Sequence, residues 1–278
     1  MPDVDVAVIG AGAAGLSVAA ISAGLGLKVA LFERGEMGGD CLNHGCVPSK
    51  ALLAAAHAAA EARRARHFGV HVGAPQVDWA GVRAHVAGAI AAIAPNDSAE
   101  RFRGMGAEGV RATARFVARD SLEAGQPAGG GGGRGRLGRG GVGGGSADIP
   151  PPIPGLSDVP FLTNETLFAL PGKPGHLVII GGGPIGLEMA QAHARLGCRV
   201  SVIEALTIAA REDAECVAGL RPALLADGVA LHEGARVARV ERDAQGVAVV
   251  LEDGGRIAGT RLLLAVGRAP RLDALGLE

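Results

Sequence analysis

Two cysteines, Cys41 and Cys46, lie within the run Gly-Gly-Asp-Cys-Leu-Asn-His-Gly-Cys-Val-Pro-Ser-Lys at residues 38–50. The Ala-rich residues 51–65 that follow predict a helix, which places Cys46 in the turn leading into it. The positive end of a helix dipole, roughly half a charge, favours a thiolate. Most cysteines are small buried packing residues, but this position favours a thiol pair that forms and breaks a disulfide.

A glycine-rich turn precedes the cysteines. Residues 4–9 are an apolar run that predicts a buried strand, and Gly10-Ala-Gly12-Ala13-Ala14-Gly15 follows before a helix-like stretch to about residue 26. Gly10 permits a sharp turn, Gly12 lets backbone approach a pyrophosphate, and Gly15 lets helix and strand pack closely. A second strand-like run ends at Glu33, 18 residues after Gly15, near the roughly 20 expected for an acid that accepts from a ribose hydroxyl.

The same pattern returns in the second half of the chain. Apolar residues 177–180 precede another glycine turn, a helix to about residue 196 and a strand that ends at Glu204, again 18 residues after the third glycine. One Gly-x-Gly-x-x-Gly run alone is as often an ordinary turn, but two with strand, helix and acid in place predict two dinucleotide sites. The second turn consists of Gly181, Gly182, Gly183, Pro184, Ile185 and Gly186.

The acid that ends the second pattern bears on the choice of nucleotide. A carboxylate at Glu204 accepts from a 2′-hydroxyl and repels a 2′-phosphate, which favours NAD(H) over NADP(H). Arg199 and Arg211 lie nearby in the sequence and could weaken that preference, but we interpret both as solvated surface charges.

Composition excludes several classes of function. The chain has 278 residues, enough for two domains, and its 27 basic and 28 acidic side chains give no single-sign field for nucleic acid or a membrane surface. Acids at the N-terminus argue against a signal peptide, so we expect a cytoplasmic protein. Cys198 and Cys216 have no partner at metal-ligand spacing; we expect both to be buried packing residues and expect no metal site.

Taken in order, the first glycine turn, the two-cysteine run and the second turn resemble the class I pyridine nucleotide–disulfide oxidoreductases, the FAD-dependent family of dihydrolipoamide dehydrogenase, mercuric reductase and glutathione reductase. Further matches lie at residues 151–156, 163–165 and 265–270, and Glu204 argues against the NADP-linked glutathione branch. The resemblance implies an α/β fold with two Rossmann-like, three-layer domains, the NAD domain being inserted into the FAD domain. The expected bounds are 1–150, 151–266 and 267–278, the last being a return to the FAD domain.

The resemblance also implies roles for individual residues. Cys46 matches the flavin-side thiol, and Cys41 matches the interchange thiol that meets the substrate. Lys50 matches a lysine that pairs, beside the flavin, with the glutamate matched by Glu188. FAD would bind at Gly10, Gly12, Ala13, Ala14, Gly15, Glu33 and Gly39. NAD would bind at Gly181, Gly183, Pro184, Ile185, Gly186, Glu204 and Gly267.

The implied reaction is flavin-dependent dithiol–disulfide oxidoreduction, a role in cell redox homeostasis. Electrons would pass between nicotinamide, flavin and the disulfide of Cys41 and Cys46, and the dithiol would exchange with a small-molecule disulfide or similar acceptor. Lipoamide, mercuric ion and other disulfides stay open, as does the direction of electron flow. The alternatives are a flavin diaphorase or transhydrogenase, against which both cysteines count, and a non-catalytic remnant that at most binds an adenine dinucleotide.

Two parts of the chain depart from the family pattern. Residues 126–148 are glycine-rich, with Leu137 and Val142 as the only sizeable apolar residues, so we expect disorder and no buried strand, in a natural linker or in a segment translated out of frame. The sequence ends at Glu278, where relatives continue into a dimerisation domain. We therefore expect this chain to be truncated, to lack the main homodimer interface of the family, and to have impaired turnover.

Overall fold

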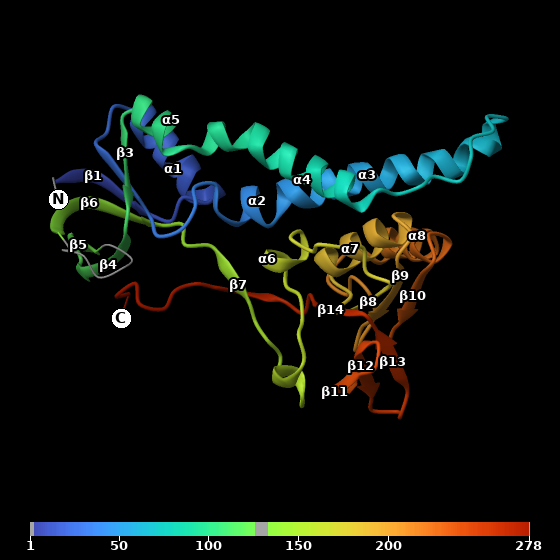
Figure 1. The fold of residues 1–278 in the computed structure, drawn as a ribbon. Helices are drawn as coiled ribbons and strands as arrows, with labels where there is room; N and C mark the ends of the chain where they lie inside the picture. The colour runs from blue at the N-terminus through green and yellow to red at the C-terminus, as the bar shows by residue number, and fades with distance from the viewer. Residues whose placement is uncertain (1–2, 126–132, 278) are drawn as a thin grey trace. The chain divides into compact units, whose positions relative to one another are not determined.

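The computed structural model of the chain describes residues 3–125 and 133–277. Two compact units are formed: the first comprises residues 1–47, 88–147 and 269–278, and the second comprises residues 48–87 and 148–268 (Figure 1). The second unit therefore interrupts the first in the sequence, as the predicted fold class requires. Residues 48–87, which we expected in the first domain, group with the second unit.

A six-stranded sheet forms the first unit, in the order β3-β2-β1-β6-β5-β4. Strands β3, β2, β1 and β6 run parallel, whereas β5 is antiparallel to both β6 and β4. The helix α1 packs on β1, β2 and β3, where Val8, Leu16 and Leu31 share one apolar core. The elements are β1 (Val4–Ile9), α1 (Ala13–Gly24), β2 (Val29–Glu33), α2 (Gly39–Asn43), α5 (Ala99–Gly104), β3 (Ala107–Arg111), β4 (Thr113–Ala118), β5 (Ser121–Gly125) and β6 (Gly133–Val142).

The strand β6 corrects the prediction that residues 126–148 are disordered: residues 133–142 form a strand inside the sheet, although only Gly135 and Leu137 of it are buried. It pairs with β1 from Val4 opposite Leu137 to Ile9 opposite Val142, and Leu137 is only 7% exposed. Counting the apolar side chains of this segment alone gave the wrong result, because its neighbours supply the core and its backbone supplies hydrogen bonds to both sides. Gly138 also faces the carbonyl of Asp5 so closely that a Cβ would lie 2.9 Å from the oxygen. Residues 126–132 lie outside the described part of the chain.

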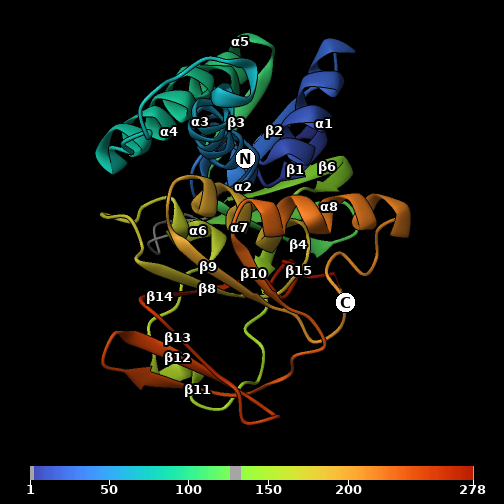
Figure 2. The same cartoon turned by 90° about the vertical axis from the view of Figure 1, so that its right-hand side faces the viewer.

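The second unit has three layers, seen from the side in Figure 2. Strands β10-β9-β8-β14 form a parallel sheet, with α7 and α8 on one face and the antiparallel sheet β11-β12-β13 on the other. Apolar residues of both sheets, among them Val178, Leu262 and Val249, share one core. The elements are α6 (Asn164–Leu167), β8 (His176–Ile180), α7 (Pro184–Arg195), β9 (Arg199–Ile203), α8 (Ala214–Ala226), β10 (Val229–His232), β11 (Val237–Asp243), β12 (Gly246–Leu251), β13 (Arg256–Gly259) and β14 (Arg261–Leu264).

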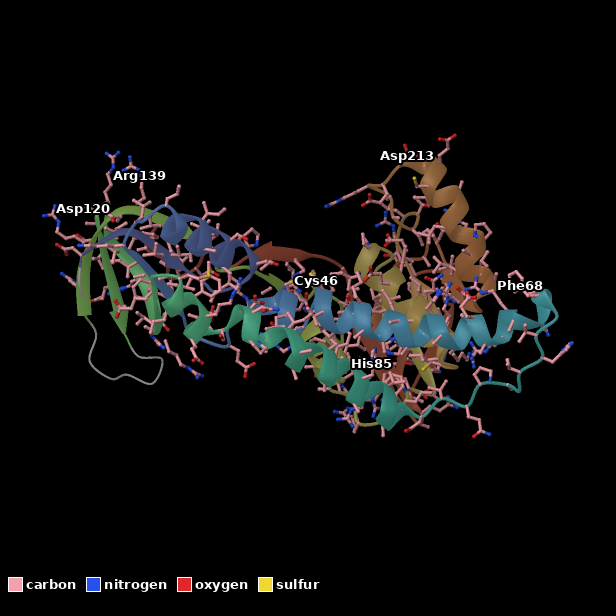
Figure 3. All side chains as sticks on the ribbon, turned by 90° about the horizontal axis from the view of Figure 1, so that it is seen from above. Cys46, Phe68, His85, Asp120, Arg139 and Asp213 are labelled. Atoms are coloured by element: carbon pink, nitrogen blue, oxygen red, sulfur yellow. The ribbon has the colours of Figure 1, made fainter. Side chains whose placement is uncertain are left out.

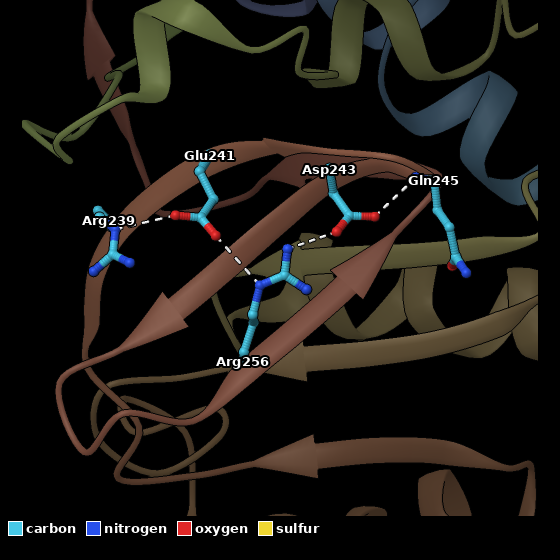
Figure 4. Close-up of polar contacts among 5 residues, drawn as sticks. All are labelled: Arg239, Glu241, Asp243, Gln245 and Arg256. Carbon is cyan, nitrogen blue, oxygen red and sulfur yellow. Dashed lines mark hydrogen bonds and ion pairs between the residues drawn. The ribbon is translucent and has the colours of Figure 1, made fainter.

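Charged side chains link the strands of the antiparallel sheet (Figure 4). Arg256 on β13 contacts Glu241 at 3.3 Å and Asp243 at 2.5 Å, both on β11, and Arg239 contacts Glu241 at 3.2 Å. These pairs lie on the exposed side of the sheet.

The remaining elements are the long helices and short connecting segments. They are α3 (Cys46–Arg64), η1 (Ala65–Phe68), α4 (Trp79–Ile93), η2 (Ala94–Asp97), η3 (Leu156–Asp158) and the ladder of β7 (Ser146–Asp148) with β15 (Arg268–Pro270). None of the helices within residues 3–125 and 133–277 has the length and apolarity that a bilayer crossing requires.

Candidate functional site

Cys41 and Cys46 come together in the first unit. Cys41 lies on α2, and Cys46 is the first residue of α3, where Figure 3 labels it. Both are free thiols, and their side chains are hydrogen-bonded to each other. Burial and, after it, the interaction with the neighbouring Cys46 together raise the pKa of the Cys41 thiol to about 11. At neutral pH the Cys41 sulfur therefore keeps its proton.

The helix after the cysteines begins earlier than predicted. We placed its start at Ala51, with Cys46 in the preceding turn, whereas α3 begins at Cys46 itself. The reason is Pro48, which looks like a helix breaker but is accepted in a first turn because that turn has no N–H partner to lose. A cysteine at the first position of the helix still lies at the positive end of its dipole.

The first glycine turn is a tight backbone structure in which side chains have no room. Gly10 has a φ of +100°, and a Cβ there would collide with the Gly143 carbonyl, while a Cβ on Gly15 would collide with the Gly10 carbonyl. Glu33, at the end of β2, binds this turn: its carboxylate accepts from the Ala11 N–H at 2.7 Å and from the Gly35 N–H at 2.7 Å.

A pocket of about 160 Å³ opens beside this turn. Of the predicted flavin residues, Gly10, Gly12, Glu33 and Gly39 line it. Ala13 and Ala14 are exposed at the start of α1, and Gly15 is buried beneath the turn, so these three do not line the pocket. Sequence reasoning missed the glycines that follow β6, although three consecutive glycines after a strand were a usable signal; the missed lining residues are Gly143, Gly144 and Gly145.

The second unit repeats the arrangement. Gly181 has a φ of +113°, where a Cβ would collide with the Ala265 carbonyl, and Gly186 sits beneath the Gly181 carbonyl in the same way. Glu204 at the end of β9 accepts from the Gly182 N–H at 2.8 Å and from the Leu206 N–H at 2.9 Å. In both units the acid therefore holds the middle of its glycine turn.

A cavity of about 710 Å³ lies at the carboxyl ends of β8, β9 and β14. Such ends are where open α/β sheets bind ligands. The predicted nucleotide residues Gly181, Gly183, Pro184, Ile185, Glu204 and Gly267 line it, whereas Gly186 lies underneath. Arg211 also lines it, but Arg199 does not. Beyond Glu204, no local pattern predicted that the segment 204–212 forms a wall of this cavity; all of its residues except Ile208 line it.

Lys50 and Glu188 form an ion pair within the second unit. The Lys50 Nζ atom lies 2.5 Å from Glu188 Oε1, with side chains 62% and 39% exposed. Two residues that are 138 positions apart in sequence thus meet, as the family resemblance implied. Their role beside a flavin stays a prediction.

The other two cysteines differ from each other. Cys198 is buried, which confirms its expected packing role, and burial raises its pKa to about 11. Cys216 on α8 is exposed, so the prediction of burial is wrong for this residue. It lies near the start of an amphipathic surface helix, of which only Val217 and Leu224 are buried. In the described residues no group of three or more metal-ligating side chains comes together.

Comparison with known proteins agrees with this geometry. Residues 4–278 match the family described as pyridine nucleotide-disulphide oxidoreductase. Mercuric reductase of Streptomyces lividans is 36% identical over 99% of this chain and 58% of its own length. Dihydrolipoyl dehydrogenase of Thermus scotoductus is 35% identical over 100% of this chain and 60% of its own length. LpdA from Mycobacterium tuberculosis superposes with a TM-score of 0.87, at 27% identity over 98% of this chain and 61% of its own. The flavoprotein disulfide reductase RclA from Escherichia coli superposes with a TM-score of 0.82, at 27% identity over 98% of this chain and 58% of its own.

A chain that pairs two dinucleotide-type glycine turns with a dithiol belongs to the flavin-dependent disulfide reductases as a class. This chain is a member of the pyridine nucleotide-disulphide oxidoreductase family. It spans less than two thirds of the length of these curated relatives, which are oxidoreductases.

Proposed function

We propose that this chain carries the electron-transfer half of an FAD- and NAD(P)H-dependent dithiol–disulfide oxidoreductase. The interaction between the Cys41 and Cys46 side chains carries the proposal, because a disulfide forms only between cysteines whose sulfurs can meet.

The residues of the first unit fit a flavin dinucleotide. The turn at Gly10, Gly12 and Gly15 leaves no room for a Cβ at two of its three glycines, and the pocket beside it contains Glu33. Backbone amides at such a turn hold a pyrophosphate, and a carboxylate at the strand end accepts from a ribose hydroxyl. When bound, FAD would supply a two-electron relay between a nicotinamide and the sulfur pair.

The second cavity fits a nicotinamide dinucleotide, with NAD(H) preferred to NADP(H). The carboxylate of Glu204 lies in the cavity wall, where it would repel a 2′-phosphate. Arg211 lines the same cavity, whereas Arg199 does not. Arg211 is therefore the arginine that could offset this repulsion. NAD(H) remains the favoured ligand, because Glu204 is fixed by two backbone hydrogen bonds whereas Arg211 is an exposed residue.

The thiols then perform the exchange with the acceptor. Reducing their disulfide takes two electrons and two protons: the S–S bond breaks and two thiols form. Oxidation by an external disulfide reverses this. One protein thiolate attacks the acceptor disulfide, forms a mixed disulfide and expels the first acceptor sulfur as a thiolate; the second protein sulfur then attacks the mixed disulfide, forms the protein disulfide and releases the other acceptor sulfur as a thiolate. The high pKa of Cys41 means that this sulfur needs a base to take its proton before it attacks.

The acceptor is proposed as a small-molecule disulfide or a similar thiol-reactive species. Relatives of the chain are named for mercuric ion and for dihydrolipoyl groups. By analogy with the family, we also propose that the whole protein forms a homodimer.

Thiol counting tests the proposal. The oxidised full chain is incubated with FAD, freed of unbound flavin, reduced with NADH under anaerobic conditions, and titrated with a chromogenic disulfide. We expect NADH to bleach the flavin spectrum and to expose two additional thiols per chain. Cys41→Ser and Cys46→Ser should each abolish this gain, whereas Cys216→Ser should keep it. Protein that binds FAD but gains no thiols with NADH contradicts the proposal, and protein that stays colourless favours the non-catalytic remnant.

A further inference from the structure

The wall of the second cavity is a loop that needs support. Residues 204–212 connect β9 to the region before α8, form no helix or strand of their own, and supply eight of the cavity's lining residues. Loops of this kind change shape unless contacts on their outer side hold them.

Glu233, the residue that follows β10, is the centre of these contacts. Its Oε1 atom accepts from the Ile208 N–H at 2.8 Å and from the Thr207 hydroxyl at 2.8 Å. Its carboxylate also receives both the Nε and Nη2 donors of Arg221, at 2.8 Å and 2.9 Å, and Nη2 bonds Thr207 Oγ1 at 3.0 Å. One carboxylate thus joins the middle of the loop to the helix α8.

The backbone on either side of this contact is fixed as well. The Gly234 N–H donates to the Leu206 carbonyl at 2.7 Å, and the Ala235 N–H donates to the Glu204 carbonyl at 2.9 Å. Ala209 has a φ of +47°, and its N–H donates to the Gly182 carbonyl of the glycine turn at 2.7 Å. A non-glycine residue in this conformation is strained and persists only when its surroundings hold it.

The electrostatics keep the anchor intact over a wide pH range. The hydrogen bonds from Arg221, and those from Ile208 and Thr207, lower the pKa of Glu233 to about 2 against the opposing effect of burial. The carboxylate is therefore charged and accepts hydrogen bonds at any pH at which the protein is assayed. Neither Glu233 nor Arg221 lines the cavity.

We propose that Glu233 is a positioning residue for the nicotinamide-nucleotide cavity: together with Arg221 it holds the 204–212 loop in the shape that receives the nucleotide. The inference rests on the proposed function of that cavity but names residues that do not contact the ligand. Its loss should weaken nucleotide binding without removing a ligand contact, because the loop would sample other conformations before binding.

Calorimetric titration of the full chain with NADH, performed below the onset of unfolding, tests the inference. We expect Glu233→Gln to weaken NADH binding about fivefold or more, since charged hydrogen bonds to the loop are lost. Arg221→Lys keeps the charge but loses the two-donor geometry, so it should give a smaller loss. Glu241→Gln is the matched control: it removes a glutamate from arginine pairs on the antiparallel sheet, away from the cavity, and should leave the affinity unchanged.

Hydrogen exchange of residues 204–212 provides the second readout and needs no ligand. Glu233→Gln should speed exchange at these amides by about tenfold or more, and Glu241→Gln should not. Unchanged loop exchange in Glu233→Gln overturns the positioning role, whether or not nucleotide binds. If wild-type protein does not bind NADH, the proposed function of the cavity fails, and the assignment to nucleotide binding fails with it. If the wild type binds NADH and Glu233→Gln binds it with the same affinity, the positioning role of Glu233 is overturned, while the proposed function of the cavity stands.

Discussion

The reactivity of Cys41 follows from where its sulfur lies. A thiol with a pKa near 11 has a small thiolate fraction at neutral pH, and that fraction rises about tenfold with each pH unit below the pKa. We therefore predict that the rate of Cys41 alkylation by iodoacetamide in the reduced protein rises steadily from pH 7 to pH 10, without levelling off near the ordinary thiol pKa. Fragment-resolved mass spectrometry of the peptide that contains Cys41 and Cys46 measures the rate at each position.

Cys46→Ala gives the matched comparison for this prediction. Removing the Cys46 side chain removes its hydrogen bond to Cys41 and leaves burial, with a smaller effect of Asp97, to raise the pKa of Cys41. Cys41 should then alkylate faster at a given pH than it does in the wild type. An unchanged Cys41 profile in this variant would show that the two sulfurs do not interact.

The ion pair of Lys50 and Glu188 should contribute little to the stability of the fold. Both side chains are substantially exposed, and such surface pairs contribute only about 0–1 kcal/mol to folding. We predict that Lys50→Gln and Glu188→Gln, alone or together, change the free energy of unfolding by less than about 1 kcal/mol. A double-mutant cycle in urea measures the coupling, and a loss of several kcal/mol would contradict the exposed position.

The glycines of β6 and of the turn after it differ in how closely other backbone packs against them. A Cβ on Gly143 would lie 2.9 Å from the Gly15 nitrogen and 3.0 Å from its Cα atom, so this residue must be small for the first glycine turn to close. A Cβ on Gly141 would meet nothing closer than 3.9 Å. We predict that Gly143→Ala destabilises the chain by about 1–3 kcal/mol and weakens FAD binding.

Gly141→Ala controls for the change of residue type. The same substitution, two residues earlier, should leave the stability unchanged or raise it slightly, because alanine restricts the unfolded chain more than glycine does. Thermal unfolding and flavin retention on gel filtration measure both variants. Equal behaviour of the two variants would mean that Gly143 is not a close-packing position.

Some elements of the fold could be predicted from the sequence, whereas β6 and the start of α3 could not. The two glycine turns, their strands and the acids at the strand ends were predictable, because each follows from a local spacing and a turn geometry that only glycine adopts. The strand β6 was not, since its stability comes from β1 and β5 on either side and is invisible in its own composition. The start of α3 was missed because the prediction counted only the Ala-rich run from Ala51, whereas the helix begins at Cys46.

The whole molecule carries an acid-sensitive group in its second unit. His193 on α7 is fully buried beside the Trp79 ring, with ring centroids 5.8 Å apart, and burial lowers its pKa to about 4. Above pH 6.5 the histidine is neutral in both folded and unfolded chains; as the pH falls toward 4, only the unfolded chain takes up the proton. Stability is therefore lost across this window, on the order of 3 kcal/mol for this group.

His193→Phe should flatten this dependence between pH 6.5 and 4.5, because the unfolded chain then gains one proton fewer. Trp79 is the only tryptophan in the chain, so urea unfolding followed by its fluorescence reports on this unit. His85→Phe, at an exposed histidine labelled in Figure 3, should keep the wild-type slope. The slope will not vanish, because burial also lowers the pKa of His176. Identical slopes in both variants would place the acid sensitivity elsewhere.

Long-range structure limited the site prediction at this scale. The meeting of Lys50 with Glu188 followed from family resemblance and not from any local signal, since 138 residues separate them. Glu233 had no signal at all: one glutamate after a short strand is ordinary until the fold places it under residues 204–212. Spacing along the chain predicts turns, whereas the support behind a cavity wall depends on tertiary packing.

The two glutamates that fasten the glycine turns have one more consequence. Both carboxylate oxygens of Glu33, and both of Glu204, accept hydrogen bonds from backbone amides of their own unit, so under the proposed function each unit would bind its dinucleotide through its own glutamate. A neutral or basic residue at position 204 should therefore shift the proposed coenzyme preference toward NADP(H), while Glu33 and the first glycine turn are left unchanged.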